Sequence, residues 1–243
     1  ISLPGLSDRR AQVWPGGLSI LAVLLHVLNI SNLQVSDGAL REGLLYDLLG
    51  RLQHEDARER SVQAMEARYH VDEQQAARVS RTAAKLYALC RQDWGFSSQL
   101  AGKVLDWAAR LHEIGLDISH DGYQRHGAYI AEHADMPGFP RAEQHFLALL
   151  IGGQRHRIDK SGFKILPDSW QEPGLRLLIL LRLAVLLNRS RKETEHPPLS
   201  IQVSDKAVSL SFAADWLAEN PLTIADLERE QELLEQIGYD LRI

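Results

Sequence analysis

The sequence predicts a mainly α-helical protein that ends in a small α+β module. Apolar residues recur at intervals of three, four and seven from residue 73 to about 192, which is the spacing of helices that bury one face. The run 175–187 is apolar on almost every side and indicates a helix enclosed at the centre of a bundle. Beyond it, alternating apolar residues at 199–203 and 208–212 predict a β-hairpin.

Composition and charge narrow the class of protein. The chain has 243 residues, of which 45% are hydrophobic and 24% charged, as in a globular protein with ample core. Its single cysteine, Cys90, excludes an intramolecular disulfide and suits a reducing compartment, so we expect a cytoplasmic protein. The net charge of −5 argues against nucleic-acid binding. The run 175–187 is too short to span a bilayer, which leaves at most peripheral membrane association.

Three segments differ in character along the chain. Residues 1–51 combine turn signals with short elements, whereas residues 52–192 are helical and begin with a charged linking helix. Residues 193–243 add to the hairpin a helix from 223 to about 237 and a return strand at 239–243. We therefore expect domain boundaries near residues 52 and 193.

The first segment carries one candidate phosphate-binding element. Pro15-Gly16-Gly17 is expected to break the chain just before apolar residues recur at helical spacing. Two glycines that open a helix present backbone N–H groups at the positive end of its dipole, which suits a phosphate. A plain tight turn is the alternative. Further along, 33–35 is expected to form a short strand and Ser36 to cap a following helix.

A histidine–glutamate pair stands where one predicted helix ends. The stretch 105–116 has the pattern of a buried helix that finishes at Gly115, and His112 and Glu113 lie side by side near its end. An imidazole beside a carboxylate suits phosphate binding or phosphate chemistry. The alternative is a capped helix whose histidine satisfies a hydrogen bond of the core.

Basic side chains gather in the sequence that follows. Six of the ten histidines lie between residues 112 and 156. Arg176 and Arg182 interrupt the most apolar helix, where an unpaired cation would be costly, so each is expected to meet a carboxylate or a bound anion. The acidic segment after residue 214 is expected to take no part in a polyanion site.

The order of these features resembles that of the HD phosphohydrolase superfamily. The resemblance rests on the helix end at 111–115, followed by His126, Arg155-His156 and the all-apolar helix. In that superfamily two histidines and two aspartates hold a divalent metal that activates water. Three of the four ligand positions depart from the pattern, namely Gln75 for the upstream histidine, Glu113 for the aspartate of the pair and Val185 for the late aspartate. Since a divalent metal needs several N or O ligands, we expect a degenerate metal site.

A second resemblance covers essentially the whole chain. The segments 3–6 and 15–17, and above all Ser-Asp-Gly-Ala-Leu-Arg-Glu-Gly at 36–43, resemble the exopolyphosphatase and guanosine pentaphosphate phosphohydrolase family. This resemblance implies that residues 1–51 are the C-terminal part of an actin-like (sugar-kinase-like) lobe. Residues 52–192 would then be a degenerate HD-like helical domain, and residues 193–243 a small α+β module.

The same resemblance implies an exopolyphosphatase, a Mg²⁺-dependent hydrolase that releases orthophosphate processively from the end of inorganic polyphosphate. The family's catalytic glutamate and most metal ligands would precede Ile1, so we expect this chain to be inactive alone and to hold no catalytic or metal-binding residue. Its part would be to bind polyphosphate and to form a homodimer. The alternatives are the same portion of a guanosine pentaphosphate 5′-phosphohydrolase and a metal-dependent HD phosphohydrolase.

Holding polyphosphate requires a track of basic side chains, and its binding would weaken with salt as counterions are released. The expected phosphate-loop residues are Gly16 and Gly17, and the expected polyphosphate-binding residues are His112, Arg125, His126, Arg155, His156 and Lys160. The histidines would bind phosphate best when protonated, below about pH 6.5. The alternative is that these side chains make ordinary structural contacts with nearby acids such as Glu113, Asp117, Asp121 and Asp159.

Overall fold

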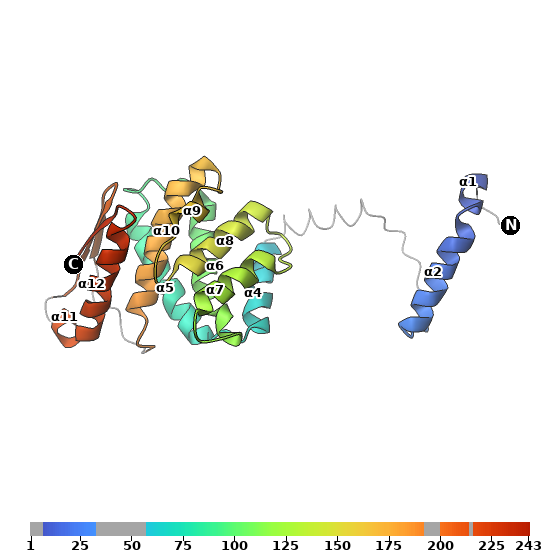
Figure 1. Cartoon of the computed structure of the whole chain (residues 1–243), viewed down its shortest axis with the longest axis horizontal. Coiled ribbons are helices and arrows are strands. Elements are labelled where there is room, and N and C mark those ends of the chain that lie inside the picture. The colour runs from blue at the N-terminus through green and yellow to red at the C-terminus, as the bar shows by residue number, and fades with distance from the viewer. Residues whose placement is uncertain (1–6, 33–56, 192–199, 214–215) are drawn as a thin grey trace. The chain divides into compact units, whose positions relative to one another are not determined.

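A computed structural model describes residues 7–32, 57–191, 200–213 and 216–243 (Figure 1). The chain divides into two units, Ile1–Leu52 and Gln53–Ile243. The strand predicted at 33–35 and the helix predicted from Ser36 lie outside the described residues.

The first unit contains α1 (Asp8–Ala11) and α2 (Trp14–Val27). The break predicted at Pro15-Gly16-Gly17 was wrong, because these residues form the first turn of α2. Proline is tolerated there, since the N–H that it lacks would have no partner within the helix and its fixed φ is helical. The N–H of Gly17 donates to the carbonyl of Val13 at 3.1 Å. Gly16 and Gly17 therefore stand in the first turn of a helix, as expected of a pair that opens one, and do not form a loop.

The helical part of the second unit confirms the periodicity of the sequence. Asp72 begins one helix by accepting from the N–H of Gln75, and Ser98 begins another by accepting from the N–H of Leu100, as N-caps do. The elements are α4 (Ala57–Arg68), α5 (Glu73–Cys90), α6 (Gln99–Arg110), the 3₁₀ turn η1 (Ile114–Asp117), α7 (Tyr123–His133), α8 (Arg141–Gly153), α9 (Lys160–Phe163) and α10 (Asp168–Leu187).

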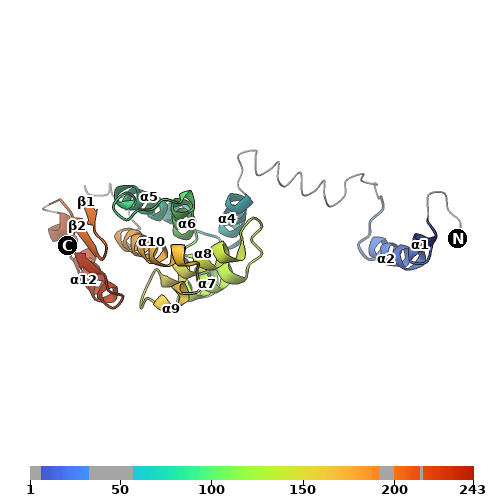
Figure 2. The same ribbon diagram turned by 90° about the horizontal axis from the view of Figure 1, so that it is seen from above.

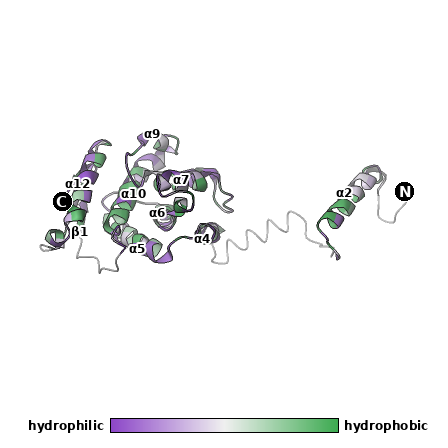
Figure 3. Ribbon diagram, turned by 60° about the horizontal axis from the view of Figure 1, so that its bottom comes forward, coloured by the Kyte–Doolittle hydropathy of each residue, from purple (hydrophilic) through white to green (hydrophobic). Residues whose placement is uncertain are grey.

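Helix α10 is the centre of this bundle, as its all-round apolar sequence predicts. Every residue of 177–184 is buried, and α5, α6, α8 and α9 all pack against the helix. Figure 2 shows α10 between α5 and α6 on one side and α8 and α9 on the other. Its hydrophobic colouring in Figure 3 agrees with this position. Within the described ranges, no helix is long and apolar enough to cross a membrane.

The C-terminal module confirms the predicted hairpin and return strand. Its sheet has the order β1-β2-β3, with β1 antiparallel to β2 and β3 parallel to β2. Its elements are β1 (Ser200–Val203), β2 (Ala207–Ser211), α11 (Trp216–Glu219), α12 (Pro221–Glu235) and β3 (Asp240–Arg242). The module contacts α10 through α12 and α5 through β1, so it lies beside the bundle at the end away from α4 (Figures 1 and 2).

Both arginines inside the apolar helix meet carboxylates of this module, as the cost of a buried unpaired charge predicts. Arg182 Nε donates to Glu230 at 2.5 Å, and Arg176 Nη2 donates to Asp205 at 2.6 Å. Trp94 adds a neutral link by donating its indole N–H to the carbonyl of Ser204 at 2.7 Å. Of these contacts, the pair of Arg182 and Glu230 holds α12 beside α10, where the two helices share a pocket.

Candidate functional site

A pocket of about 320 Å³ lies where the bundle meets α12. Its walls come from the segment after α6, the start of α7, the segment after α8, the C-terminal part of α10 and one face of α12. We call it the arginine pocket, after Arg155, Arg182, Arg189, Arg191 and Arg229. The other lining residues are Gln75, His112, Glu113, Leu116, His120, Tyr123, Gln154, His156, Val185, Leu186, Asp226, Glu230 and Leu233.

His112 forms part of the floor and is 1% exposed. Its Nδ1 lies 2.7 Å from the carbonyl oxygen of Ala109, so Nδ1 carries the hydrogen and donates. Burial, only partly offset by the charge of Glu113, holds the pKa of His112 below its ordinary value. The ring is therefore neutral, with Nε2 as an acceptor 3.9 Å from Glu113.

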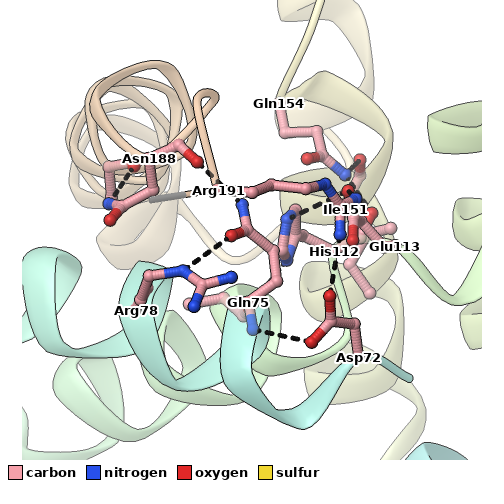
Figure 4. A network of polar contacts seen from close by, with 11 residues as sticks. Asp72, Gln75, Arg78, His112, Glu113, Ile151, Gln154, Asn188 and Arg191 are labelled. Carbon is pink, nitrogen blue, oxygen red and sulfur yellow. Dashed lines mark hydrogen bonds and ion pairs between the residues drawn. The ribbon is translucent and has the colours of Figure 1, made fainter. Parts of the chain in front are cut away.

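The residues that correspond to metal ligands are engaged with the protein itself. Gln75 donates to the carbonyl of Asn188 at 3.0 Å and accepts from Arg78 at 3.1 Å. Figure 4 shows the guanidinium of Arg191 beside Glu113 and Asp72, to which it donates at 2.5 and 2.9 Å. Arg191 thus bridges these carboxylates with one positive charge, where a divalent metal would give two.

The donor set does not fit a divalent metal. Val185 has no ligand atom, and a hydrophobic side chain stands where the HD pattern has its late aspartate. In the part of the chain that the structure describes, no three His, Cys, Asp or Glu residues lie close enough together to hold a metal ion. We therefore assign no chemical step of this pocket to a metal.

Two further arginines of the pocket are neutralised by α12. Arg182 is 2% exposed and forms a double hydrogen bond with Glu230, and Arg189 donates to Asp226 at 2.5 Å. The acidic C-terminal segment, which was expected to take no part in a polyanion site, does line this pocket: its acids offset these charges and Arg229 adds one of its own.

Positive charge remains in excess at the mouth of the pocket. Neither Arg155 nor Arg229 forms an ion pair with a carboxylate among the described residues, and Arg155 lies over the ring of Tyr123 at 5.4 Å. Partial burial and then the charges of Arg155, Arg229 and other arginines hold the pKa of His156 below its ordinary value. The backbone of His156 has a φ of 60°, a strained conformation for a residue other than glycine. Such a cluster suits an anion.

The structure brings only part of the predicted set together. His112, Arg155 and His156 line the arginine pocket, whereas Arg125, His126 and Lys160 do not. Lys160 instead donates to the carbonyl of Ile237 at 2.8 Å. Gly16 and Gly17 belong to the first unit.

The contacts with acids that were the alternative for these side chains are formed mainly by other residues. Glu113 pairs with Arg191, and Asp117 lies 2.9 Å from His70. Asp159 accepts from the N–H of Ser161, as an N-cap. Of the predicted phosphate-binding set, His112 does approach one of these acids, with its Nε2 3.9 Å from Glu113.

Sequence reasoning missed Arg229, Gln154 and Arg191. Arg229 is the single basic residue between 215 and 240, and this isolation among acids could have singled it out. Arg191 stands in a basic stretch without an acid at 175–192, which is a signal of charge but not of its partners. Gln154 carries no signal, because its role depends on helix ends that only the fold brings together.

Comparisons with known proteins agree with this architecture. Residues 57–231 match the model of Ppx/GppA phosphatase, domain III, and residues 1–52 match that of the Ppx/GppA phosphatase family. The chain is similar to the guanosine-5′-triphosphate,3′-diphosphate pyrophosphatase of Vibrio cholerae serotype O1, with 36% identity over 100% of this chain and 48% of the relative. Proteins of the same name from Photobacterium profundum and Pseudoalteromonas translucida are each 35% identical over 99% of this chain and 48% of their own length.

The chain thus spans about half the length of these relatives. The family model for domain III alone covers more than half of the chain, and it includes every residue of the arginine pocket except Leu233. The chain belongs to the Ppx/GppA phosphatase family.

Proposed function

We propose that this chain is the C-terminal portion of a guanosine-5′-triphosphate,3′-diphosphate pyrophosphatase, and that the arginine pocket binds phosphate groups of its substrate. The names of the relatives favour this activity over that of an exopolyphosphatase. Hydrolysis, with Mg²⁺, would belong to the half of the relatives that this chain does not match. The homodimer stays a prediction.

The observation that carries the proposal is the unneutralised charge at the mouth of the pocket. Arg182, Arg189 and Arg191 are each balanced by a carboxylate, but Arg155 and Arg229 have none among the described residues. His156 adds a ring nitrogen that becomes a donor when it is protonated, and a bound phosphate would raise its lowered pKa. Arginine guanidinium groups bind phosphate oxygens in pairs, which suits a compact phosphorylated group.

The shape of the site also favours a compact ligand over a long polyphosphate chain. A polymer needs basic side chains spread along a path, but Arg125, His126 and Lys160 lie outside the pocket lining, and the amine of Lys160 is bound to the C-terminal module. The basic side chains that do gather belong to one cavity. A metal-dependent HD phosphohydrolase has less support, because Arg191 is hydrogen-bonded to the carboxylates that such a metal site would use.

Calorimetric titration of the chain with guanosine pentaphosphate at several salt concentrations tests the proposal. We expect binding that weakens as salt rises and that Arg155→Ala and Arg229→Ala each weaken about tenfold, since each removes one charge-assisted contact. Arg157→Ala is the matched control, because it removes the same charge near Arg155 from a side chain that lines a different cavity. Absence of binding at low salt, or an equal loss in the control, would contradict the proposal.

A further inference from the structure

Gln154 at the floor of the arginine pocket has an acceptor that the protein leaves unused. The side chain follows the last residue of α8 and is 2% exposed. Its amide nitrogen donates to the carbonyl oxygens of His112 at 2.5 Å and Ile151 at 3.1 Å. Its Oε1 is buried and has no hydrogen-bond partner among the described residues.

The orientation of this amide is fixed by its neighbours. Turning it over would set Oε1 against the carbonyl oxygens of His112 and Ile151, and two acceptors cannot bond to each other. The amide nitrogen must therefore face these two carbonyls. Figure 4 shows the nitrogen on their side and the oxygen pointing the other way, so the acceptor is a constant feature of the pocket.

Two of the arginines that line the pocket already donate to acceptors of the protein. Arg191 donates to Asp72 and Glu113, and Arg182 donates to Glu230 and to a backbone carbonyl. An anion that has only acceptor oxygens would meet repulsion at Gln154. A ligand with its own N–H or O–H group would satisfy Oε1, and a polar site of this kind rejects analogues that lack the matching group.

We propose that Gln154 is a specificity-determining residue that selects a phosphorylated ligand carrying an N–H or O–H donor, namely a nucleoside phosphate, over inorganic polyphosphate. The inference rests on the proposed function, since it takes the arginine pocket to be the phosphate-binding site. The phosphates would contact Arg155 and Arg229 at the mouth. A base edge or a ribose hydroxyl would donate to Oε1, beside the ring of Tyr123 and the apolar side chains of Leu116 and Val185.

Calorimetry of the 243-residue chain with two triphosphates tests this selection. Guanosine 5′-triphosphate and inorganic tripolyphosphate have similar charge, but only the nucleotide carries donors apart from its phosphates. We expect the nucleotide to bind at least about tenfold more tightly, the usual worth of one buried hydrogen bond. Inosine triphosphate and 2′-deoxyguanosine triphosphate then identify the donor, because they lack the exocyclic amine and one ribose hydroxyl respectively.

Gln154→Leu removes the acceptor together with its repulsion of an acceptor-only anion. The preference for the nucleotide is therefore expected to fall to less than about threefold, while tripolyphosphate binds as tightly as before or more tightly. Gln144→Leu is the matched control. Gln144 is also a buried glutamine whose amide donates to backbone carbonyls, but it lines another cavity. Its variant is expected to keep the preference.

The ligand series on the unaltered chain decides the question even where Gln154→Leu fails to fold. Equal affinity for guanosine triphosphate and tripolyphosphate overturns the role of Gln154 and leaves the phosphate site standing. If Gln154→Leu still prefers guanosine triphosphate to tripolyphosphate as strongly as the unaltered chain does, the proposed role of Gln154 is overturned as well. Failure of every triphosphate to bind at low salt overturns the proposed function itself.

Discussion

Replacing Glu230 with glutamine tests the buried ion pair that holds α12 against α10. The change keeps the shape of the side chain and removes its charge, so Arg182 is left as a buried cation without a counter-charge. We expect the free energy of unfolding to fall, and the C-terminal module to be released before the bundle unfolds. The arginine pocket would then lose the wall that carries Arg229.

The magnitude follows from burial and geometry. Arg182 and Glu230 are 2% and 6% exposed, and two hydrogen bonds of 2.5 and 2.8 Å join them. Removing one partner of such a pair costs about 3–5 kcal/mol. A glutamine oxygen can still accept from Arg182, and a third guanidinium donor remains on the carbonyl of Gly153 at 2.5 Å. The loss should therefore lie near 3 kcal/mol.

Urea unfolding followed by circular dichroism and tryptophan fluorescence measures this loss. Trp94 reports on the module, because its indole donates to Ser204. Glu228→Gln is the control, since it makes the same change at an exposed position of α12 and should cost less than about 0.5 kcal/mol. The double variant Arg182→Met, Glu230→Leu should recover most of the stability. A loss below about 1 kcal/mol for Glu230→Gln, or no recovery in the double variant, would refute the reasoning.

Three further predictions concern single positions of the second unit. Gly115→Ala should lower the free energy of unfolding, measured in urea, by about 3 kcal/mol or more, because a Cβ there would lie 2.0 Å from the carbonyl oxygen of Tyr123. Gly102→Ala is the control: its Cβ would meet only a side-chain ring at 3.2 Å, so it should not destabilise the chain. Tyr239→Phe should lower the free energy of unfolding, measured by thermal unfolding, by about 1 kcal/mol, because the hydroxyl of Tyr239 donates to the half-exposed carboxylate of Glu172 on α10 at 2.5 Å. Because the pKa of His112 is lowered in the folded chain, the unfolded chain binds a proton at a pH where the folded chain does not. The stability that the neutral His112 allows is therefore fully present above about pH 6.5, and it is lost as the pH falls towards the folded pKa. His112→Gln should therefore show a weaker loss of stability between pH 8 and pH 5 than the unaltered chain.

The elements that the sequence predicts well are those whose burial repeats along the chain. Helix α5 buries Ala76, Val79, Ala83 and Leu86 on one face, and that face is visible as a period in the sequence. The hairpin is equally readable, because alternate residues of β1 and β2 are buried. The prediction of a turn at Pro15 was wrong because proline and glycine occur both in turns and at helix starts, and only the residues that follow them decide between the two.

The pocket could be predicted only in part, because its residues meet through docking of the module. His112 could be found from its place at a helix end. Arg125 and Lys160 share the sequence neighbourhood and charge of the lining residues. Arg125 does not line the pocket, although its charge helps to lower the pKa of His156, and Lys160 is held by the carbonyl of Ile237. Arg229 belongs to a segment that is acidic overall, so the charge of its sequence neighbours gave no reason to expect a residue of a basic pocket there.

Arg191 explains how a pocket with the outline of a metal site can serve a different purpose. A divalent ion would draw Asp72 and Glu113 together and activate water beside them. Here one guanidinium joins the same carboxylates and activates nothing, because its protons are already shared with them and it does not ionise at neutral pH. Arg191, with the charge of Arg78 near Asp72, offsets the two acids, and on the proposed function the charges of Arg155 and Arg229 would then attract phosphate. On the proposed function, exchanging metal ligands for an arginine would remove hydrolysis from this pocket and favour binding, since the carboxylates that would repel a phosphate are compensated.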